Sequence, residues 1–303
     1  ILGVVGVVVI SSADYMSKLK NLEGEYYGLM LFSASGMMLL AATTDLISIY
    51  IAMELTALPL AALAAFLGNA RATESGMKFL LLSAMSSAIL LYGMTLTYGF
   101  TGTTQLSEIL QQLGSSVNGN IPFGSHAMFL GVIMIVAGFG FKIAAVPFQM
   151  WVPDVYEGSP TPITAYLSVA SKAAGFAVIL RVFYLTFPQM GLDWSSLFAV
   201  LSAVSMTIGN LVAIAQTNIK RMLAYSTVAH AGFLMMGVAA IGSVAISGGS
   251  STGPSSVLFY LVAYAITNLS AFFVVIAVSN HTNSEEISSF TGLGKRSPIL
   301  AVI

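Results

Sequence analysis

The sequence of 303 residues contains no cysteine. It therefore offers no thiolate for an iron–sulfur cluster, no disulfide and no thiol nucleophile. It also lacks the glycine-rich phosphate loops of nucleotide-binding proteins and the HExxH pattern of a zinc helix. No cofactor or metal is expected in this chain, and any redox chemistry linked to it must lie in another chain.

Charged residues are scarce as well. They make up 8% of the sequence, against about 25% in ordinary soluble domains, while hydrophobic residues make up 57%. The net charge is -1, and no basic cluster exceeds pairs such as Lys220-Arg221. This composition argues against a water-soluble fold and against nucleic-acid binding, and it indicates a protein surrounded by lipid.

Long apolar runs fill most of the chain. A helix needs about 20 mostly apolar residues to cross the hydrocarbon layer, and backbone polar groups at that depth must be satisfied within the segment. We therefore predict an all-α, polytopic membrane protein, because the alternating pattern of barrel strands is not seen. Eight full spans are expected, at about Tyr26 to Ala42, Leu46 to Leu67, Met77 to Phe100, His126 to Met150, Ile163 to Phe187, Trp194 to Ala215, Leu223 to Ile246 and Ser256 to Val278.

Residues 1–25 are predicted to be the end of a preceding membrane helix and a basic loop. That loop carries Lys18 and Lys20, and the run after Pro298 resembles the start of another helix.

The basic residues alternate from loop to loop, which is the pattern of the positive-inside rule. One set of loops carries Lys18, Lys20, Arg71, Lys220, Arg221, Lys295 and Arg296. We expect these loops on the cytoplasmic face or its equivalent, with Lys220 in a solvated loop. Trp151 and Trp194 fall at predicted span ends and are expected to be interfacial anchors.

Glu54 lies inside the span LISIYIAMELTALPLAALAAFL, which has no other charged side chain. A carboxylate at membrane depth costs about 3 kcal/mol on insertion scales, so such residues usually face the interior of a bundle and serve a function. Pro59 could loosen the helix and admit water or a partner. The alternative is a carboxylate that is interfacial or merely paired.

Lys142 follows Gly138 and Gly140 and precedes Pro147 in GVIMIVAGFGFKIAAVPFQMW. Glycines and a proline around a buried cation predict a broken helix, which in transporters brings unpaired backbone groups to an ion site near the midplane. This is a suitable place for a proton-carrying lysine. The alternative is a lysine whose amine extends to the interface.

Lys172 lies at the centre of ITAYLSVASKAAGFAVILRVF, too far from either end for its side chain to reach water easily. A structural lysine paired with a carboxylate is the alternative. His230, in MLAYSTVAHAGFLMMG, could relay protons because imidazole titrates near neutral pH. A hydrogen-bonded core histidine is an equally good explanation for this residue.

These groups permit a mechanism in which Glu54 controls the proton on Lys142. At an effective dielectric of about 20, two charges about 4 Å apart interact by roughly 4 kcal/mol. That exceeds the membrane potential, which is worth about 2.3 kcal/mol per charge per 100 mV. Movement of one group relative to the other could therefore drive loading and release of a proton.

Two segments resemble the antiporter-like subunit N family of respiratory complex I, the proton-pumping NADH:quinone oxidoreductase. They are GFGFKIAAVPFQMWVPDVYEGSPTPITAYLSVASKAAGF and TNIKRMLAYSTVAHAGFLMMG, and the resemblance extends from about Tyr26 to Ile303. The run WVPDVYEGSPTP is specific, because sister subunits and Mrp sodium/proton antiporters differ after the W-x-P-D core.

The resemblance implies two inverted five-helix repeats, each with one broken helix. Residues 26–187 would form the first repeat and residues 188–303 the second, incomplete at its C-terminal end. Glu54, Lys142 and Lys172 would match the family's proton-transferring glutamate and lysines, and His230 would lie on the same polar axis. A further family lysine would lie beyond Ile303.

The resemblance also implies partners and a location. The chain would translocate protons beside other membrane subunits of complex I, antiporter-like subunits included, while NADH, FMN, iron–sulfur clusters and quinone belong to partner subunits. An integral protein of the bacterial plasma membrane is expected, with an organellar energy-converting membrane as the alternative. Two other functions stay open: a subunit of a Mrp-type sodium/proton antiporter, and a structural membrane subunit whose buried charges fix helix registry.

Overall fold

The computed structural model describes residues 1–16, 22–116, 124–187, 191–245 and 252–302. Lys18 and Lys20 of the predicted basic loop lie outside the described residues. The α-helices are α1 (Leu2–Met16), α2 (Glu23–Ala42), α3 (Leu46–Ala64), α4 (Ala70–Thr101), α5 (Leu106–Ser116), α6 (Gly124–Ile143), α7 (Val152–Gly158), α8 (Thr161–Tyr166), α9 (Lys172–Thr186), α10 (Gly191–Ile214), α11 (Ile219–Ala245), α12 (Thr252–Thr282), α13 (Leu293–Arg296) and α14 (Pro298–Val302). A π-helix (Leu167–Ser171) joins α8 to α9, and a 3-10 turn (Ile287–Phe290) follows α12.

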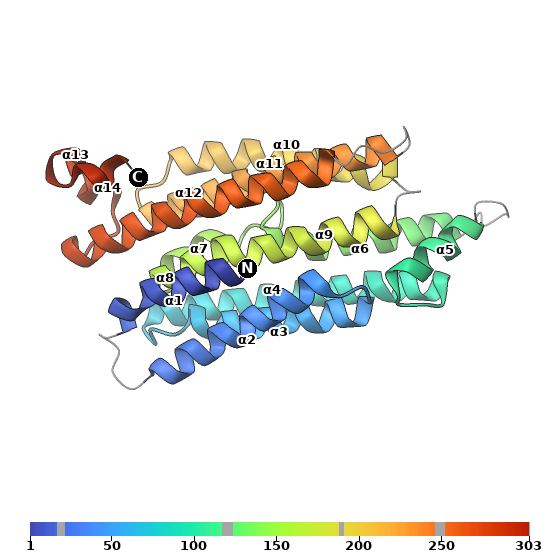
Figure 1. Cartoon of the computed structure of the whole chain (residues 1–303), viewed down its shortest axis with the longest axis horizontal. Helices are drawn as coiled ribbons and strands as arrows, with labels where there is room; N and C mark the ends of the chain where they lie inside the picture. Colours follow the sequence, from blue (N-terminus) through green and yellow to red (C-terminus); the bar gives the residue numbers. More distant parts are fainter. Residues whose placement is uncertain (17–21, 117–123, 188–190, 246–251, 303) are drawn as a thin grey trace.

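The long helices run side by side along the longest dimension of the molecule (Figure 1). Among the described residues, seven helices are long and apolar enough to cross a membrane. They are Leu46–Ala64, Ala70–Thr101, His126–Ile143, Thr161–Thr186, Trp194–Ile214, Ile219–Ile241 and Gly253–Thr282. The prediction of an all-α integral membrane protein is confirmed.

One predicted span differs from these seven. The run from Tyr26 to Ala42 is helical in α2, but α2 is not among the helices found apolar enough to span. Two glutamates in its first turn, Glu23 and Glu25, and the serines along it lower its apolar content. The helix α5 lies in a segment that was expected to be a loop, and the buried side chains of Leu106 and Ile109 anchor it.

The helix that carries Lys142 ends earlier than predicted. α6 stops at Ile143, whereas the apolar run continues to Met150. Ala144 has a left-handed φ of 63°, and the peptide bond between Val146 and Pro147 is cis. The chain then turns until α7 begins at Val152. An irregular segment therefore follows Lys142 directly, in the interior of the molecule.

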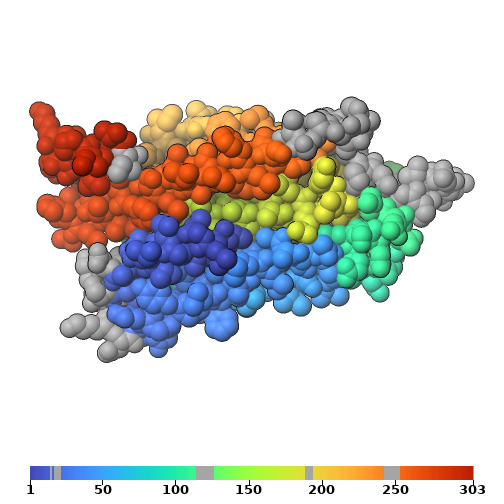
Figure 2. Space-filling view, viewed as in Figure 1, coloured from blue at the N-terminus to red at the C-terminus, as the bar shows by residue number. Residues whose placement is uncertain are grey.

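Small residues allow the helices to approach closely, as is typical of membrane bundles. A side chain added at Gly36 of α2 would lie 2.7 Å from the backbone nitrogen of Thr56 in α3. A side chain at Gly209 of α10 would lie 2.6 Å from the backbone nitrogen of Ala229 in α11. Figure 2 shows α1 lying across the surface between the early and the late helices.

The basic residues of the described loops gather at one end of the bundle. The backbones of Asn218 and Glu286 form an isolated β-bridge at this end, near the start of α11. The backbones of Asp45 and Gln105 form a second one at the opposite end, where α3 and α5 begin (Figure 1). The expectation for the tryptophans was wrong. Trp151 is 4% exposed and Trp194 is fully buried, because each ring packs among other aromatic rings and its Nε1 donates to a backbone carbonyl.

Candidate functional site

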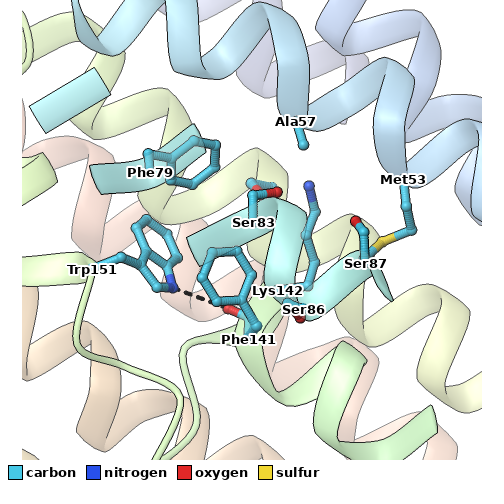
Figure 3. A pocket seen from close by; sticks show the side chains of 10 residues that line it. Met53, Ala57, Phe79, Ser83, Ser86, Ser87, Phe141, Lys142 and Trp151 are labelled. Atoms are coloured by element: carbon cyan, nitrogen blue, oxygen red, sulfur yellow. Dashed lines mark hydrogen bonds between the residues drawn. The ribbon is translucent and has the colours of Figure 1, made fainter. Parts of the chain in front are cut away.

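Lys142 lies at the last turn of α6 and is 6% exposed. Its Nζ is buried and has no hydrogen-bond partner, so the amine does not reach the interface. The amine faces a small cavity of about 10 Å³. This volume is about what one water molecule requires. Figure 3 shows the side chain running between Ser83 and Ser87 of α4 toward Ala57 of α3.

Glu54 belongs to the same region. Its neighbours along α3, Met53 and Ala57, line the Lys142 cavity. One carboxylate oxygen, Oε1, is buried without a hydrogen-bond partner. Among the ion pairs of the described residues, none joins Glu54 to Lys142. Any electrostatic interaction between the two groups therefore acts over more than the distance of a contact ion pair.

The segment before α9 connects the two lysines. Ser171 lines the Lys142 cavity, and Lys172 is the next residue. Gly175 faces the stem of Lys142, because a Cβ added there would lie 3.3 Å from Lys142 Cγ and 2.8 Å from Ile143 Cγ2. The end of α6 and the start of α9 are therefore in close contact at this point.

Lys172 is 3% exposed, and its amine has the hydrogen-bond and aromatic contacts that the Lys142 amine lacks. Its Nζ donates a hydrogen bond to the backbone carbonyl of Thr227 in α11 and lies 5.3 Å from the centre of the Tyr264 ring in α12. A cation over an aromatic face is a favourable arrangement in a dry site. None of the ion pairs found among the described residues includes Lys172, so the paired-carboxylate alternative has no support there.

A polar network that the sequence reasoning missed surrounds Lys172. The Tyr264 hydroxyl lies 3.0 Å from Thr227 Oγ1 and donates to the Ser168 carbonyl at 3.3 Å. Asn268 Nδ2 donates to both Ser168 Oγ and the Tyr264 hydroxyl, each at 2.9 Å. A signal was present, because Tyr260, Tyr264 and Asn268 recur every four residues on an otherwise apolar helix and so share one face.

His230 joins this network at its edge. Its Nδ1 lies 2.6 Å from the Tyr260 hydroxyl, and its ring centre lies 5.1 Å from that of Tyr264. The structure thus places Lys142 at a cavity that the α3 neighbours of Glu54 help to line, and it brings Lys172 and His230 to one aromatic ring. Ser171 and Gly175 lie where the two groups meet.

An ionic network lies at the basic end of the bundle, on α4, α7 and α11. Asp154 of α7 accepts from Lys78 at 2.6 Å and from Arg221 at 2.9 Å. Glu157 accepts from Arg221 at 2.8 Å and pairs with Arg71 at 3.3 Å. Burial alone would raise the pKa of Asp154, but hydrogen bonds from Lys78 and Arg221 outweigh it and lower that pKa.

The expectation of a solvated Lys220 was wrong. Lys220 is 2% exposed, and its amine lies 3.1 Å from Glu285 Oε1. It also donates to the carbonyls of Glu157 and Ser159 at 3.0 and 2.8 Å. The side chain is buried because it holds the end of α7 against the segment after α12. Lys295, which is exposed in α13, is a lysine better suited as a control.

The described residues contain no group of three or more His, Asp or Glu side chains that could hold a metal ion.

The sequence matches the family described as NADH:quinone oxidoreductase/Mrp antiporter, TM, over residues 43–303. The chain belongs to this family. Curated relatives of this chain are named NADH-quinone oxidoreductase subunit N, which confirms the resemblance noted in the sequence.

Two such relatives illustrate the similarity. The chain is 46% identical to subunit N of Dehalococcoides mccartyi over 299 residues, which cover 98% of this chain and 61% of the relative. It is 46% identical to subunit N of Moorella thermoacetica over 293 residues, 96% of this chain and 59% of the relative. The chain thus spans about three fifths of the length of these relatives.

Solved structures agree on the fold of this family. A chain of respiratory complex I from Thermus thermophilus is 33% identical, with a TM-score of 0.75, and the match covers 99% of this chain and 63% of that one. A chain of a membrane-bound sulfane sulfur reductase, an archaeal respiratory complex, is 26% identical with a TM-score of 0.83, covering 99% and 59% of the two chains. A chain of the Mrp complex from Dietzia, at 21% identity and a TM-score of 0.80 over 99% and 54%, shares the fold.

Proposed function

We propose that this protein translocates protons as a membrane subunit of an NADH:quinone oxidoreductase, coupled to quinone reduction elsewhere in the complex. One observation carries the proposal: the Lys142 amine and a Glu54 carboxylate oxygen are both buried with no hydrogen-bond partner among the described residues, and the amine faces a cavity of about the size of one water. Unpaired ionisable groups inside a membrane bundle are costly, so their presence points to function. The similarity to relatives named NADH-quinone oxidoreductase subunit N supports the same complex.

In this proposal Lys142 is the central proton carrier. Glu54 stabilises its charged form across the gap between them, and loss of that interaction favours release of the proton. Lys172 is the next acceptor, since Ser171 lines the cavity of Lys142 and the Lys172 amine follows on the same segment. Tyr264 and His230 continue the polar path into α11 and α12.

The same proposal includes two inverted repeats. Residues 26–187 form the first repeat and residues 188–303 the second, incomplete repeat, with residues 1–25 as the end of a preceding helix and a basic loop. The interruption between α6 and α7 is the broken helix of the first repeat, and the left-handed Ala144 supports this assignment. Partner subunits, antiporter-like ones among them, supply NADH, FMN, iron–sulfur and quinone chemistry.

The test uses the full-length subunit within its complex, in inverted membrane vesicles. Lys142→Ala and Glu54→Gln are each expected to lower proton pumping by about tenfold or more, the contribution of one positioned proton-transfer group. Lys295→Ala, an exposed lysine at the basic end, is the matched control and should pump as the parent does. Normal pumping in Lys142→Ala would overturn the proposal.

Two controls separate the alternatives. A sodium/proton antiporter would show pumping that depends on sodium and persists without quinone reduction, so the proposal requires the opposite. A structural subunit would lose assembly and keep pumping per assembled complex. The unpartnered Lys142 amine argues against a structural pair at that position.

A further inference from the structure

Two hollows are stacked along α4. The Lys142 cavity is the inner one. The outer one, here called the charged pocket, has a volume of about 200 Å³ and is lined by Ser75, Lys78, Asp154 and other members of the ionic network. The charged pocket opens at the basic end of the bundle, and it is large enough for several waters.

The two hollows share one helix, α4, but no lining residue. Ser75 and Lys78 line the charged pocket, whereas Phe79 and Ser83 line the Lys142 cavity. With a rise of 1.5 Å per residue, Ser75 and Ser83 lie about 12 Å apart along the helix. After α6, Trp151 lines the inner cavity, and Asp154, one turn later, lines the outer pocket.

An aromatic layer, formed by Phe79, Phe141 and Trp151, lies between the hollows. The ring centres of Phe79 and Trp151 are 4.9 Å apart, those of Phe141 and Trp151 are 5.4 Å apart, and those of Phe79 and Phe141 are 6.1 Å apart. All three side chains are buried. Trp151 Nε1 donates to the Phe141 carbonyl at 3.2 Å, which fixes the indole (Figure 3).

We propose that this aromatic layer is a water gate that closes the Lys142 cavity to the charged pocket. The one polar atom on these three rings, Trp151 Nε1, already donates to the Phe141 carbonyl, so the rings offer a water between the hollows no free donor. Rotation of one ring would open a passage from a wet pocket to the unpaired amine. The gate deepens the proton-translocation proposal, and its closure can be tested without any measurement of protons.

The ionic network controls the position of the gate. Trp151 comes directly before α7, and α7 is tied to α4 and α11 through Asp154 and Glu157. Because the indole and the two carboxylates lie on one short segment, a shift of α7 moves the ring and its ion pairs together. Rearranged ion pairs at the basic end would therefore change access to Lys142.

These 303 residues contain no cysteine, so a thiol introduced among them can be followed on its own peptide. Ser83→Cys places a reporter thiol in the wall of the Lys142 cavity and leaves Lys142 intact. The full-length subunit in its complex is treated with a small cationic methanethiosulfonate in inverted vesicles, which expose the face predicted to be cytoplasmic. The labelling rate is read by mass spectrometry on this chain alone.

Ser83→Cys alone should react slowly, and Phe79→Ala added to it should raise the rate by about tenfold or more, since the rings no longer exclude a polar reagent. The matched control is Phe183→Ala. Phe183 is a buried ring that packs on Trp194 and Phe198 in a second aromatic cluster, away from both hollows. This control should leave the rate unchanged. If Phe79→Ala impairs assembly, Phe79→Val tests the same point with a smaller loss of packing.

Three outcomes would overturn the gate: fast labelling of Ser83→Cys with all rings present, no acceleration by either Phe79 variant, or equal acceleration by Phe183→Ala. Failure of the broader function has a different signature. Normal pumping in Lys142→Ala with the labelling pattern intact would remove the proton function and leave the gate. Lost pumping in Lys142→Ala, together with labelling of Ser83→Cys that neither Phe79 variant accelerates, would remove the gate and leave the proton function.

Discussion

Lys142 and Lys172 are buried to a similar extent, 6% and 3% exposed, yet their surroundings differ. Lys142 has a carboxylate nearby, a cavity of about 10 Å³ in front of it and no hydrogen-bond partner. Lys172 has a carbonyl acceptor and an aromatic face, and no described carboxylate pairs with it. The first amine thus lacks the fixed contacts that hold the second in place.

The difference shows how a membrane interior tolerates a cation. A hydrogen bond and a ring face stabilise the charge of Lys172 and also order α9, α11 and α12 around it. Lys142 has no such contact among the described residues, so its amine orders no other helix. Removal of each side chain should therefore have a different consequence.

The largest effect is expected for the amines themselves. Lys142→Met should lower pumping by about tenfold or more and leave the amount of assembled complex unchanged, because no partner loses a hydrogen bond. Lys172→Met should lower both pumping and assembly, because the ordered contacts to Thr227 and Tyr264 are lost. Proton uptake per assembled complex, measured beside native-gel quantification, separates the two. Equal losses of assembly would break the comparison.

An intermediate effect is expected at Tyr264. Tyr264→Phe keeps the ring over Lys172 but removes the hydroxyl that contacts Thr227, Ser168 and Asn268. A buried polar group left without its partner costs about 1–3 kcal/mol, so the thermal stability of the complex should fall measurably.

Tyr260→Phe is the control for this variant. Tyr260 lies on the same helix as Tyr264, and this variant removes one hydrogen bond, between the Tyr260 hydroxyl and His230 of α11. Its thermal stability should stay nearer to that of the parent, and a larger loss than in Tyr264→Phe would show that the network is not centred on Lys172.

The smallest effect concerns pH at the basic end. The pKa of Asp154 is lowered in the folded protein, so its ion pairs contribute stability above its ordinary value of 3.8 and lose that contribution as the pH falls through the lower folded value. Asp154→Asn should lower the free energy of unfolding near neutral pH by about 1 kcal/mol or less. The difference between parent and variant should be constant from pH 8 to about 5 and shrink only below that range. A difference that already changes near pH 7 would implicate another group.

Much of the site could be predicted from the sequence because buried charges are conspicuous in apolar runs. Histidine aside, Glu54 and Lys142 are the only acidic or basic residues of their spans, and Lys172 shares its span only with Arg181. The two lysines are buried in the structure, as is the Oε1 atom of Glu54. Lys220 and the tryptophans were misjudged for one reason. A position near a span end suggests solvent or interface, but tertiary partners bury these side chains: Glu285 pairs with Lys220, Phe79 packs on Trp151, and Trp194 donates to the Phe187 carbonyl.

The network around Lys172 was missed for a related reason. Tyrosine and asparagine are tolerated in many membrane helices, so their spacing on α12 marked a polar face without naming what it meets. The lysine that it meets lies nearly a hundred residues earlier, and only packing of α9 against α11 and α12 brings the groups together.

Composition and apolar periodicity alone determined that this protein is a helical membrane bundle and which side chains would be expensive inside it, because the hydrocarbon layer imposes its length and polarity on each segment separately. The tertiary structure decided which of those side chains are satisfied and which remain unpaired. It placed a water-sized cavity at one lysine, an aromatic face at the other and a ring layer between two hollows. Those outcomes depend on contacts between segments far apart in the chain, and no local pattern encodes them.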